Sequence, residues 1–431
     1  MKKQLVEKFF NISIDHPCNQ IQAETDSKKI QPGMIFFAIE GKKTDGHLFV
    51  EEAKKNGAIL AVVDKNKIPD VDIPYVSVSN TVETLQSLAK FHVQSMFCKI
   101  IGITGSVGKS TTKEFISQIL ETSYKVGKTQ GNRNSQIGLA LSLIDLLGDE
   151  EVLVLEMGMS QPGDIKKLMK MVVPHISVLT NIGISHIGNF NSILGIADEK
   201  SDIVDHPLIE LALIEKNCFQ YEVLRKKLKT QYVSYNLDQF VKGDTFHYED
   251  FSFDLNQLEM RQDHFIKNLI PAIGIAKYLN VPNDKIEARI FSLEGLDHRF
   301  KVIKDKKCLI IDDAYNSSLE SLSLAIESIQ KQKIHGKKIA VIGAILEQGH
   351  FSYEHHVEVG KVLNGKFERI YCIGDPMLVA FDYLKEKGQE VYFLNTKKEI
   401  VDAINRDLDS EDLIFLKGSN SYRLWEIVDL I

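Results

Sequence analysis

The chain has 431 residues, of which 44% are hydrophobic and 26% are charged, and its formal net charge is -7. These values are typical of a soluble globular protein, and the length predicts two to four domains of roughly 100–200 residues each. A net negative charge argues against nucleic acid binding as the main function. No apolar run approaches the roughly 20 residues of a membrane span and the first residues lack the apolar core of a signal peptide, so we expect a cytoplasmic protein. The five cysteines are far apart and form no CxxC pair, which predicts reduced thiols.

The pattern of residues 1–97 predicts a small α/β domain. Apolar residues 34–39 and 59–64 predict buried strands, and residues 47–56 predict an amphipathic helix between them. The segment 25–33 is polar and rich in turn residues. It is either a solvated loop or part of a site, and its pattern favours neither.

A glycine-rich segment follows at residues 99–115, with the sequence KIIGITGSVGKSTTKEF. Its first residues predict a buried strand, and the residues from Ser110 onward predict a helix. The glycines allow several backbone N–H groups to point at one polyphosphate, while Lys109 can reach the terminal phosphates and Ser110 can bind Mg²⁺. The strict P-loop pattern has a glycine where Ile103 stands, so this is a shortened variant. We interpret the segment as an ATP site and not as an ordinary turn between a strand and a helix.

Two further predicted strands lead to candidate site residues. Residues 152–155 predict a buried strand that ends in Glu156, and residues 176–183 predict another that is followed by His186. A carboxylate at the carboxyl end of a strand beside a phosphate loop suits a Mg²⁺ ligand. Lys200 lies in a predicted helix among acidic residues. Lone residues of these types are usually structural, but their positions after buried strands favour a function for His186 and Lys200.

Strands and helices alternate to the end of the sequence. Over residues 98–296 this alternation predicts a central P-loop ATPase-like domain with a mostly parallel sheet. Residues 297–431 predict a Rossmann-like C-terminal domain with its site at the carboxyl ends of the strands. Its strands are expected within residues 308–316, 337–349, 369–374, 391–395 and 413–421. The predicted fold class is therefore α/β with three domains.

Short motifs distributed along nearly the whole chain resemble, in order, those of the Mur ligase family, the ATP-dependent amide-bond-forming enzymes of peptidoglycan synthesis. The motifs are DSK (26–28), TDGH (44–47), TGSVGKSTTKE (104–114), GNRNSQIG (131–138), EMGMSQPGDI (156–165), TNIGISH (180–186), Lys200, His264, Asn268, Arg299, DDAYN (312–316) and KGS (417–419). Within the family, EMGMSQPGDI, DDAYN and KGS are most similar to the members that add D-alanyl-D-alanine to UDP-N-acetylmuramoyl-tripeptide.

The resemblance implies a ligase that works through an acyl phosphate. A substrate carboxylate would attack the γ-phosphate of ATP, and the amine of D-alanyl-D-alanine would then attack the acyl carbon and displace phosphate. ATP and Mg²⁺ are the implied cofactors. UDP-muramoyl peptide and D-alanyl-D-alanine are the implied small-molecule partners, with no nucleic acid and no membrane span, and we expect a monomer.

The resemblance also implies roles for individual residues. The expected catalytic residues are Lys109, Glu156, His186, Lys200 and Arg299, and the expected metal ligands are Ser110, Glu156 and His186. Lys200 matches a lysine that is carbamylated in related ligases and supports a second metal. The residues implied for ATP binding are Thr104, Gly105, Ser106, Val107, Gly108, Lys109, Ser110, Thr111, Asn268, Arg299, Asp313 and Tyr315. The residues implied for binding the other substrates are Ser27, Lys28, Thr44, Asp45, His47, Asn132, Asn134, Asn316, Lys417 and Ser419.

Some positions depart from the family pattern. Lys28 stands where an arginine is usual, residues 317–319 (SSL) stand where DDAYN is usually followed by Ala-Asn-Pro, and Ala344 stands where an acidic residue is usual. The last two departures lead us to expect that specificity for the incoming amine lies on the loops after Asn316 and Gly343. Two alternatives stay open. The chain is either a Mur-like ligase with a different amine acceptor, or a P-loop ATPase or kinase that forms no amide bond.

Overall fold

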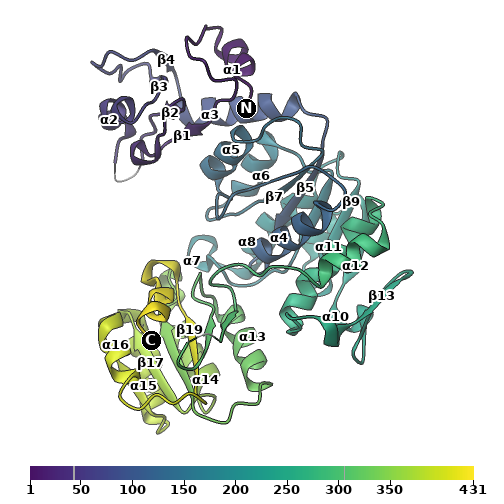
Figure 1. Ribbon diagram of the computed structural model, residues 1–431, viewed down its shortest axis with the longest axis vertical. Helices are drawn as coiled ribbons and strands as arrows, with labels where there is room; N and C mark the ends of the chain where they lie inside the picture. Colours follow the sequence, from purple (N-terminus) through teal and green to yellow (C-terminus); the bar gives the residue numbers. More distant parts are fainter. Residues whose placement is uncertain (42–43, 305) are drawn as a thin grey trace.

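The computed structural model describes residues 1–41, 44–304 and 306–431. The chain forms three α/β domains that follow one another along the long axis of the molecule, with the N-terminal domain at one end and the C-terminal domain at the other (Figure 1). This confirms the predicted fold class. The main sheets of the three domains lie within residues 1–97, 98–296 and 297–431.

The N-terminal domain is built on a four-stranded parallel sheet in the order β1-β2-β3-β4. The two apolar segments predicted as strands form its buried centre. The predicted helix over 47–56 is shorter than expected, because a 3₁₀ turn over Gly46–Phe49 precedes it. The elements are α1 (Lys3–Phe10), β1 (Ala23–Glu24), β2 (Ile35–Phe37), α2 (Val50–Lys55), β3 (Leu60–Asp64), β4 (Tyr75–Val78) and α3 (Thr81–Gln94).

The central domain contains a six-stranded, fully parallel sheet in the order β10-β9-β8-β5-β7-β6. A small antiparallel sheet, β11-β12-β13, was not predicted. The strands are β5 (Lys99–Thr104), β6 (Val126–Lys128), β7 (Val152–Glu156), β8 (Ile176–Leu179), β9 (Leu211–Glu215), β10 (Gln231–Tyr235), β11 (Val241–Lys242), β12 (Thr245–Tyr248) and β13 (Phe251–Asp254). The helices are α4 (Lys109–Leu120), α5 (Gln136–Ile144), α6 (Asp164–Met171), α7 (Ile187–Phe190), α8 (Ile193–Ser201), α9 (Glu222–Lys227), α10 (Leu237–Phe240), α11 (Asp263–Tyr278) and α12 (Asn283–Ile290).

The C-terminal domain has a second six-stranded sheet, in the order β14-β15-β19-β16-β17-β18. Only the edge strand β14 is antiparallel to its neighbour. The strands are β14 (Lys301–Ile303), β15 (Leu309–Asp312), β16 (Lys338–Gly343), β17 (Arg369–Ile373), β18 (Val391–Phe393) and β19 (Leu413–Lys417). The helices are α13 (Leu319–Gln330), α14 (Ser352–Leu363), α15 (Leu378–Glu386) and α16 (Lys397–Ile404).

The hydrophobic cores continue across both domain boundaries. Leu85 of α3 belongs to the same buried cluster as Leu139 of α5. On the other side, the cluster that contains Phe265 of α11 continues through Phe300 to Ile326 of α13. The rings of Phe265 and Phe300 lie 6.3 Å apart. Because burial of apolar surface is favourable, this packing helps to hold each outer domain against the central one.

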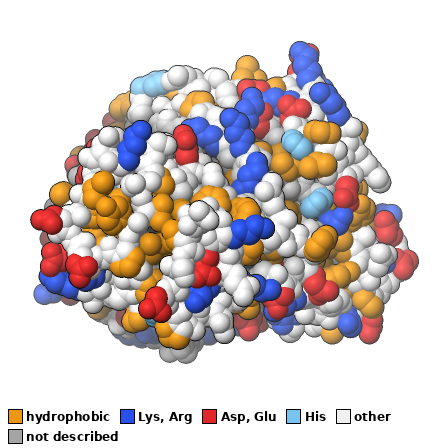
Figure 2. All heavy atoms as spheres, turned by 90° about the horizontal axis from the view of Figure 1, so that it is seen from above, with side chains coloured by type: hydrophobic (Ala, Val, Ile, Leu, Met, Phe, Trp, Pro, Cys, Tyr) orange, Lys and Arg blue, Asp and Glu red, His pale blue; other side chains and the backbone are white. Residues whose placement is uncertain are grey.

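None of the helices within the described residues is long and apolar enough to cross a membrane. Figure 2 shows the face seen from above, where basic side chains lie among acidic and hydrophobic ones. All five cysteines are free, as predicted.

One buried carboxylate far from the phosphate loop gives a test of the fold alone. Asp412 is 2% exposed, and its two oxygens accept hydrogen bonds from the N–H groups of Lys337 (2.7 Å) and Asp409 (3.0 Å), where β16 and β19 begin. We expect Asp412→Ala to lower the free energy of unfolding by about 1–3 kcal/mol, because two partly buried N–H groups lose their acceptor. Thermal melting measures the loss. Asp402→Ala, an exposed change on α16, is the control, and equal melting of the two variants would contradict the assignment.

Candidate active site

The segment predicted to bind ATP forms the connection between β5 and α4. β5 lies between β7 and β8, and the strand order reverses there: β8, β9 and β10 follow on one side, and β7 and β6 on the other. Parallel α/β sheets bind ligands at such a switch point, beyond the carboxyl ends of the strands. Gly105 and Gly108 have φ angles of +153° and +87°. A Cβ at Gly105 would lie 1.9 Å from Thr180 Oγ1, and one at Gly108 would lie 2.5 Å from Asn268 Oδ1. Both the backbone conformation and the close contacts therefore require glycine.

Asn181, which the sequence analysis missed, holds the phosphate loop from the end of β8. Its Oδ1 accepts hydrogen bonds from the N–H groups of Ser106 (2.9 Å) and Val107 (2.8 Å). Thr180 donates a hydrogen bond to the carbonyl of Val107 (2.6 Å). Adjacent N–H groups directed at one oxygen are the arrangement that binds phosphate oxygens. The available signal was the position of Asn181 directly after a buried strand, within the TNIGISH motif.

Lys109 is the first residue of α4 and folds back over the loop. Its Nζ donates hydrogen bonds to the carbonyls of Gly105 (2.7 Å) and Ser106 (3.3 Å). Burial lowers the pKa of Lys109 below its ordinary value, against the attraction of Glu156 and with added repulsion from Arg299. A half-buried cation at this position is suited to bind an anion on the loop.

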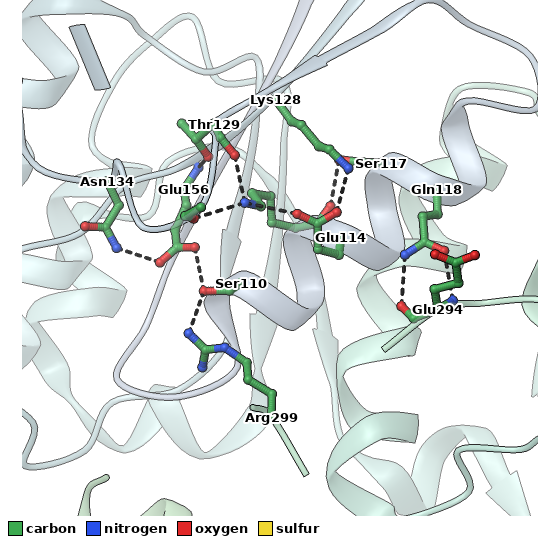
Figure 3. Close-up of polar contacts among 12 residues, drawn as sticks. Ser110, Glu114, Ser117, Gln118, Lys128, Thr129, Asn134, Glu156, Glu294 and Arg299 are labelled. Carbon is green, nitrogen blue, oxygen red and sulfur yellow. Dashed lines mark hydrogen bonds and ion pairs between the residues drawn. The ribbon is translucent and has the colours of Figure 1, made fainter. Parts of the chain in front are cut away.

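Ser110 and Glu156, the predicted Mg²⁺ ligands, lie in contact (Figure 3). Glu156 is 2% exposed at the carboxyl end of β7, and its Oε2 accepts a hydrogen bond of 2.7 Å from Ser110 Oγ. Its Oε1 accepts one of 2.6 Å from Asn134 Nδ2. The backbone N–H of Glu156 donates to Thr129 Oγ1 (3.0 Å). The carboxylate is thereby fixed beside the phosphate loop, and Asn134, expected to bind substrate, lies against it.

The oxygens of Ser110 and Glu156 fit a magnesium site of the nucleotide-dependent type. Mg²⁺ in such sites is held by one or two carboxylates, with phosphate oxygens and water as the remaining ligands. Over residues 1–41, 44–304 and 306–431, no group of three or more His, Cys, Asp or Glu side chains is placed to hold a metal ion. The protein therefore offers a hydroxyl and a carboxylate, and the nucleotide must supply further ligands.

Arg299 reaches this region from the segment that enters the C-terminal domain. Its Nη2 donates a hydrogen bond to Ser110 Oγ (3.0 Å), as Figure 3 shows, and its guanidinium lies 4.2 Å from the centre of the Tyr315 ring. The N–H of Tyr315 donates to the carbonyl of His298 (2.9 Å). Arg299 of the hinge and Tyr315 of the DDAYN motif, both expected in the ATP site, therefore lie in contact.

Asn268, expected to contact adenine, projects from α11 toward the phosphate loop. Its Oδ1 accepts a hydrogen bond from Thr112 Oγ1 (3.2 Å) beside Gly108. Thr104 and Thr111 of the expected ATP site are both buried at the two ends of the loop. These three side chains therefore surround the loop that was predicted to hold the nucleotide.

His186 and Lys200 lie in different surroundings. Nδ1 of His186 lies 2.7 Å from Oε2 of Glu347 in the C-terminal domain, and this contact lowers the pKa of Glu347 against the effect of burial. Among the described polar contacts, Glu156 meets Ser110 and Asn134 but not His186. Lys200 is 2% exposed on α8, and burial, with repulsion from Lys109, lowers its pKa well below the ordinary value.

The predicted residues of the C-terminal domain form a connected group. Lys417 is buried, and its Nζ lies 2.5 Å from Asp313 Oδ2 and 3.2 Å from the carbonyl of Asn316. The other oxygen of Asp313 accepts a hydrogen bond from the N–H of Phe300 (3.1 Å). Ser419 accepts one from the N–H of Leu346 (2.9 Å). Asp313 and Lys417 therefore fix the hinge segment that carries Arg299.

The side-chain contacts of the predicted residues in the N-terminal domain are with other residues of the same domain. Asp45 contacts Nδ1 of His47 (2.6 Å) and Nζ of Lys67 (2.7 Å), and hydrogen bonding to Lys67 is the main reason for the lowered pKa of Asp45. His47 Nε2 accepts a hydrogen bond from the N–H of Asp64 (2.9 Å). Ser27 is buried and donates to Glu52. Lys28, Thr44 and Asn132 are exposed and remain predictions for substrate contact.

Comparison with known protein families covers all three domains. The matching family models are the Mur ligase family, catalytic domain (residues 23–92), the Mur ligase middle domain (103–282) and the Mur ligase, glutamate ligase domain (298–420). The chain is 32% identical over 426 residues to the UDP-N-acetylmuramoyl-tripeptide–D-alanyl-D-alanine ligase of Bacillus subtilis, covering 94% of this chain and 92% of that protein. The chain belongs to the Mur ligase family.

Other comparisons agree with this assignment to the Mur ligases. The Escherichia coli protein with the same name as the Bacillus subtilis relative is 25% identical over 94% of this chain and 92% of its own length. The structure of MurF ligase from Thermotoga maritima in complex with ADP has a TM-score of 0.79 and 27% identity, covering 100% of this chain and 98% of that one. A MurF structure from Acinetobacter baumannii, at 24% identity and a TM-score of 0.83, covers 100% of this chain and 98% of that one and supports the fold.

Lys109 gives the most direct test of the phosphate loop of this Mur ligase. We expect Lys109→Ala to lower turnover at least about a hundredfold, as does the loss of one electrostatic contact to the transition state in other enzymes. Steady-state release of ADP measures the effect. Lys128→Ala is a matched control, since Lys128 pairs with Glu114 on the far side of α4. A folded Lys109→Ala protein with near-normal turnover would remove the loop from the mechanism.

Proposed function

We propose that this Mur ligase joins D-alanyl-D-alanine to the peptide carboxylate of UDP-N-acetylmuramoyl-tripeptide in an ATP-dependent step of peptidoglycan synthesis. The observation that carries the proposal is the similarity to UDP-N-acetylmuramoyl-tripeptide–D-alanyl-D-alanine ligases along nearly the whole chain, which includes the domain expected to take the acceptor. The ADP bound in the related Thermotoga maritima structure supports ATP as the nucleotide substrate. We also propose that the protein works as a monomer, and nucleotide substrates support a cytoplasmic location.

The first step transfers the γ-phosphoryl group of ATP to the substrate carboxylate. One carboxylate oxygen attacks phosphorus, the bond to the β-phosphate oxygen breaks, and ADP leaves. The protein contributes positioning and charge neutralisation. The N–H groups in the first turn of α4 bind phosphate oxygens, and Lys109 and Arg299 stabilise the negative charge of the transferred group.

The second step forms the amide. The neutral amine of the acceptor attacks the acyl carbon of the acyl phosphate, the C–O bond to phosphate breaks, inorganic phosphate leaves with that oxygen, and the nitrogen loses one proton to solvent. In this proposal the C-terminal domain presents the acceptor to the central domain. Contacts between the two domains, such as His186 with Glu347, support an arrangement in which they meet at the reaction site.

Ser110 and Glu156 would hold Mg²⁺ together with the nucleotide. The ion would neutralise phosphate charge and act as a Lewis acid on the phosphoryl oxygens. His186 remains a proposed ligand of a second ion.

A different amine remains the second candidate, because residues 317–319 and Ala344 depart from the usual pattern on the two loops expected to bind it. Membership of the Mur ligase family disfavours an ATPase that forms no amide bond.

We predict that the purified protein releases ADP over many turnovers only when both a UDP-muramoyl tripeptide and an amine are present, with one amide formed per ADP. The reason is that each half-reaction consumes one substrate. A coupled ADP assay and mass spectrometry of the nucleotide product, over a panel of amino acids and dipeptides, measure the two quantities. ADP release without either substrate would favour a simple ATPase, and amide formation with another amine in preference to D-alanyl-D-alanine would favour the second candidate.

We also propose that Lys200 works as a carbamate. Burial lowers the pKa of Lys200 and so favours the neutral amine, the form that reacts with CO₂, and the reaction replaces a cation with an anion. We expect Lys200→Ala to be poorly active and to be partly rescued by added short carboxylates. ¹³C-labelled CO₂ should give a carbamate signal in the wild-type protein and not in Lys200→Ala. Lys167→Ala, at an exposed lysine of α6, is the control. Full activity of Lys200→Ala would make Lys200 a structural residue.

A further inference from the structure

Glu320 is a carboxylate of the C-terminal domain that reaches the reaction region of the central domain. It lies in the first turn of α13, and its Oε1 accepts a hydrogen bond of 2.6 Å from the N–H of Ile184, two residues before His186. The carboxylate packs on Gly183, where a Cβ would approach Oε1 to 2.6 Å. The sequence analysis gave Glu320 no role.

The second oxygen of Glu320 has no partner in the described part of the chain. Oε2 is buried without a hydrogen bond, and none of the described ion pairs includes Glu320. The hydroxyl of Ser317, a residue only 9% exposed, is also buried without a partner three residues earlier. A buried carboxylate oxygen and a buried hydroxyl without partners are costly, unless a ligand supplies the missing hydrogen bonds.

The charges around Glu320 indicate the sign of charge of a ligand that would supply the missing hydrogen bonds. Glu320 is close enough to Lys200 to favour the charged form of that amine, although burial still dominates and keeps the pKa of Lys200 low. A carbamate at Lys200 would place a second negative charge in the same region. A cation arriving with the substrates would therefore gain from both groups, whereas an anion would be repelled.

We propose that Glu320 binds the ammonium form of the incoming amine substrate through Oε2 and so positions its nitrogen, which attacks after losing one proton to solvent, with Ser317 as a second acceptor. This role rests on the proposed ligase function. The ammonium has three N–H donors, which matches a carboxylate oxygen and a hydroxyl that lack partners. Contact with Ile184 places Glu320 beside the segment that carries His186, so the acceptor and the phosphorylated carboxylate would meet there.

The test is Glu320→Gln, assayed at saturating ATP and UDP-muramoyl tripeptide with D-alanyl-D-alanine varied. Glutamine can still accept a hydrogen bond from Ile184 but has no negative charge. We expect the KM for the dipeptide to rise about tenfold or more, the size expected for loss of a hydrogen bond to a charged group, with the KM values for the other two substrates unchanged. Single-turnover ADP release without amine should also be unchanged, because acyl phosphate formation does not involve the ammonium.

Two further variants separate recognition from structure. Glu320→Ala also removes the contact with Ile184. Glu354→Gln is the control: it changes an exposed carboxylate on α14 and should leave all three KM values unchanged. An unchanged dipeptide KM in Glu320→Gln, or an equal rise in all three KM values, would overturn the proposal and leave Glu320 as an interdomain contact. If Glu320→Gln does not fold, Glu320→Asp keeps the charge but withdraws it, and an unchanged dipeptide KM there would equally overturn the proposal.

The wild-type assay separates failure of this proposal from failure of the proposed function. A wild-type protein that forms no amide with D-alanyl-D-alanine or with any other amine of the panel rejects the ligase function, and the role of Glu320 with it. An active wild type with an unaffected Glu320→Gln variant rejects the role of Glu320 alone.

Discussion

The buried carboxylate of Glu156 is the constraint on which the arrangement of the site depends. A charged group that is 2% exposed is stable only when its oxygens are satisfied, and here Ser110 and Asn134 each supply a hydrogen bond. Those bonds connect the start of α4, the end of β7 and the segment before α5. Arg299 then binds Ser110 from the hinge, so the position of the third domain is linked to the same carboxylate. A metal ion with its nucleotide would enter a region that is already organised for it.

The boundary between the central and C-terminal domains combines apolar packing with a few charged contacts. Phe265 and Phe300 pack across it, whereas His186 meets Glu347 and Ile184 meets Glu320 nearer the phosphate loop. Apolar packing is not directional, but the charged contacts require particular positions. This division allows the domains to stay associated while the polar groups that face the substrates adjust to them.

Local patterns in the sequence predicted much of the fold and part of the site. The apolar segments became buried strands, and the contact between Ser110 and Glu156 followed from two strand ends that share one edge of a parallel sheet. The roles of Asn181 and Glu320 could not be predicted in this way. Their partners are backbone N–H groups of distant segments, and such groups are present at almost every residue. The antiparallel sheet β11-β12-β13 was missed because its strands are short. His47 shows a different limit, because its motif predicted substrate binding. In the structure both of its ring nitrogens contact residues within the N-terminal domain.

The central claim is that the phosphate loop activates a carboxylate as an acyl phosphate before the amide forms. The fate of the carboxylate oxygen tests it directly. UDP-muramoyl tripeptide labelled with ¹⁸O in the reacting carboxyl group is converted with ATP and D-alanyl-D-alanine, and the released phosphate is analysed by mass spectrometry. The account predicts that each inorganic phosphate carries one oxygen from the carboxylate. Amide formation with unlabelled phosphate would contradict it.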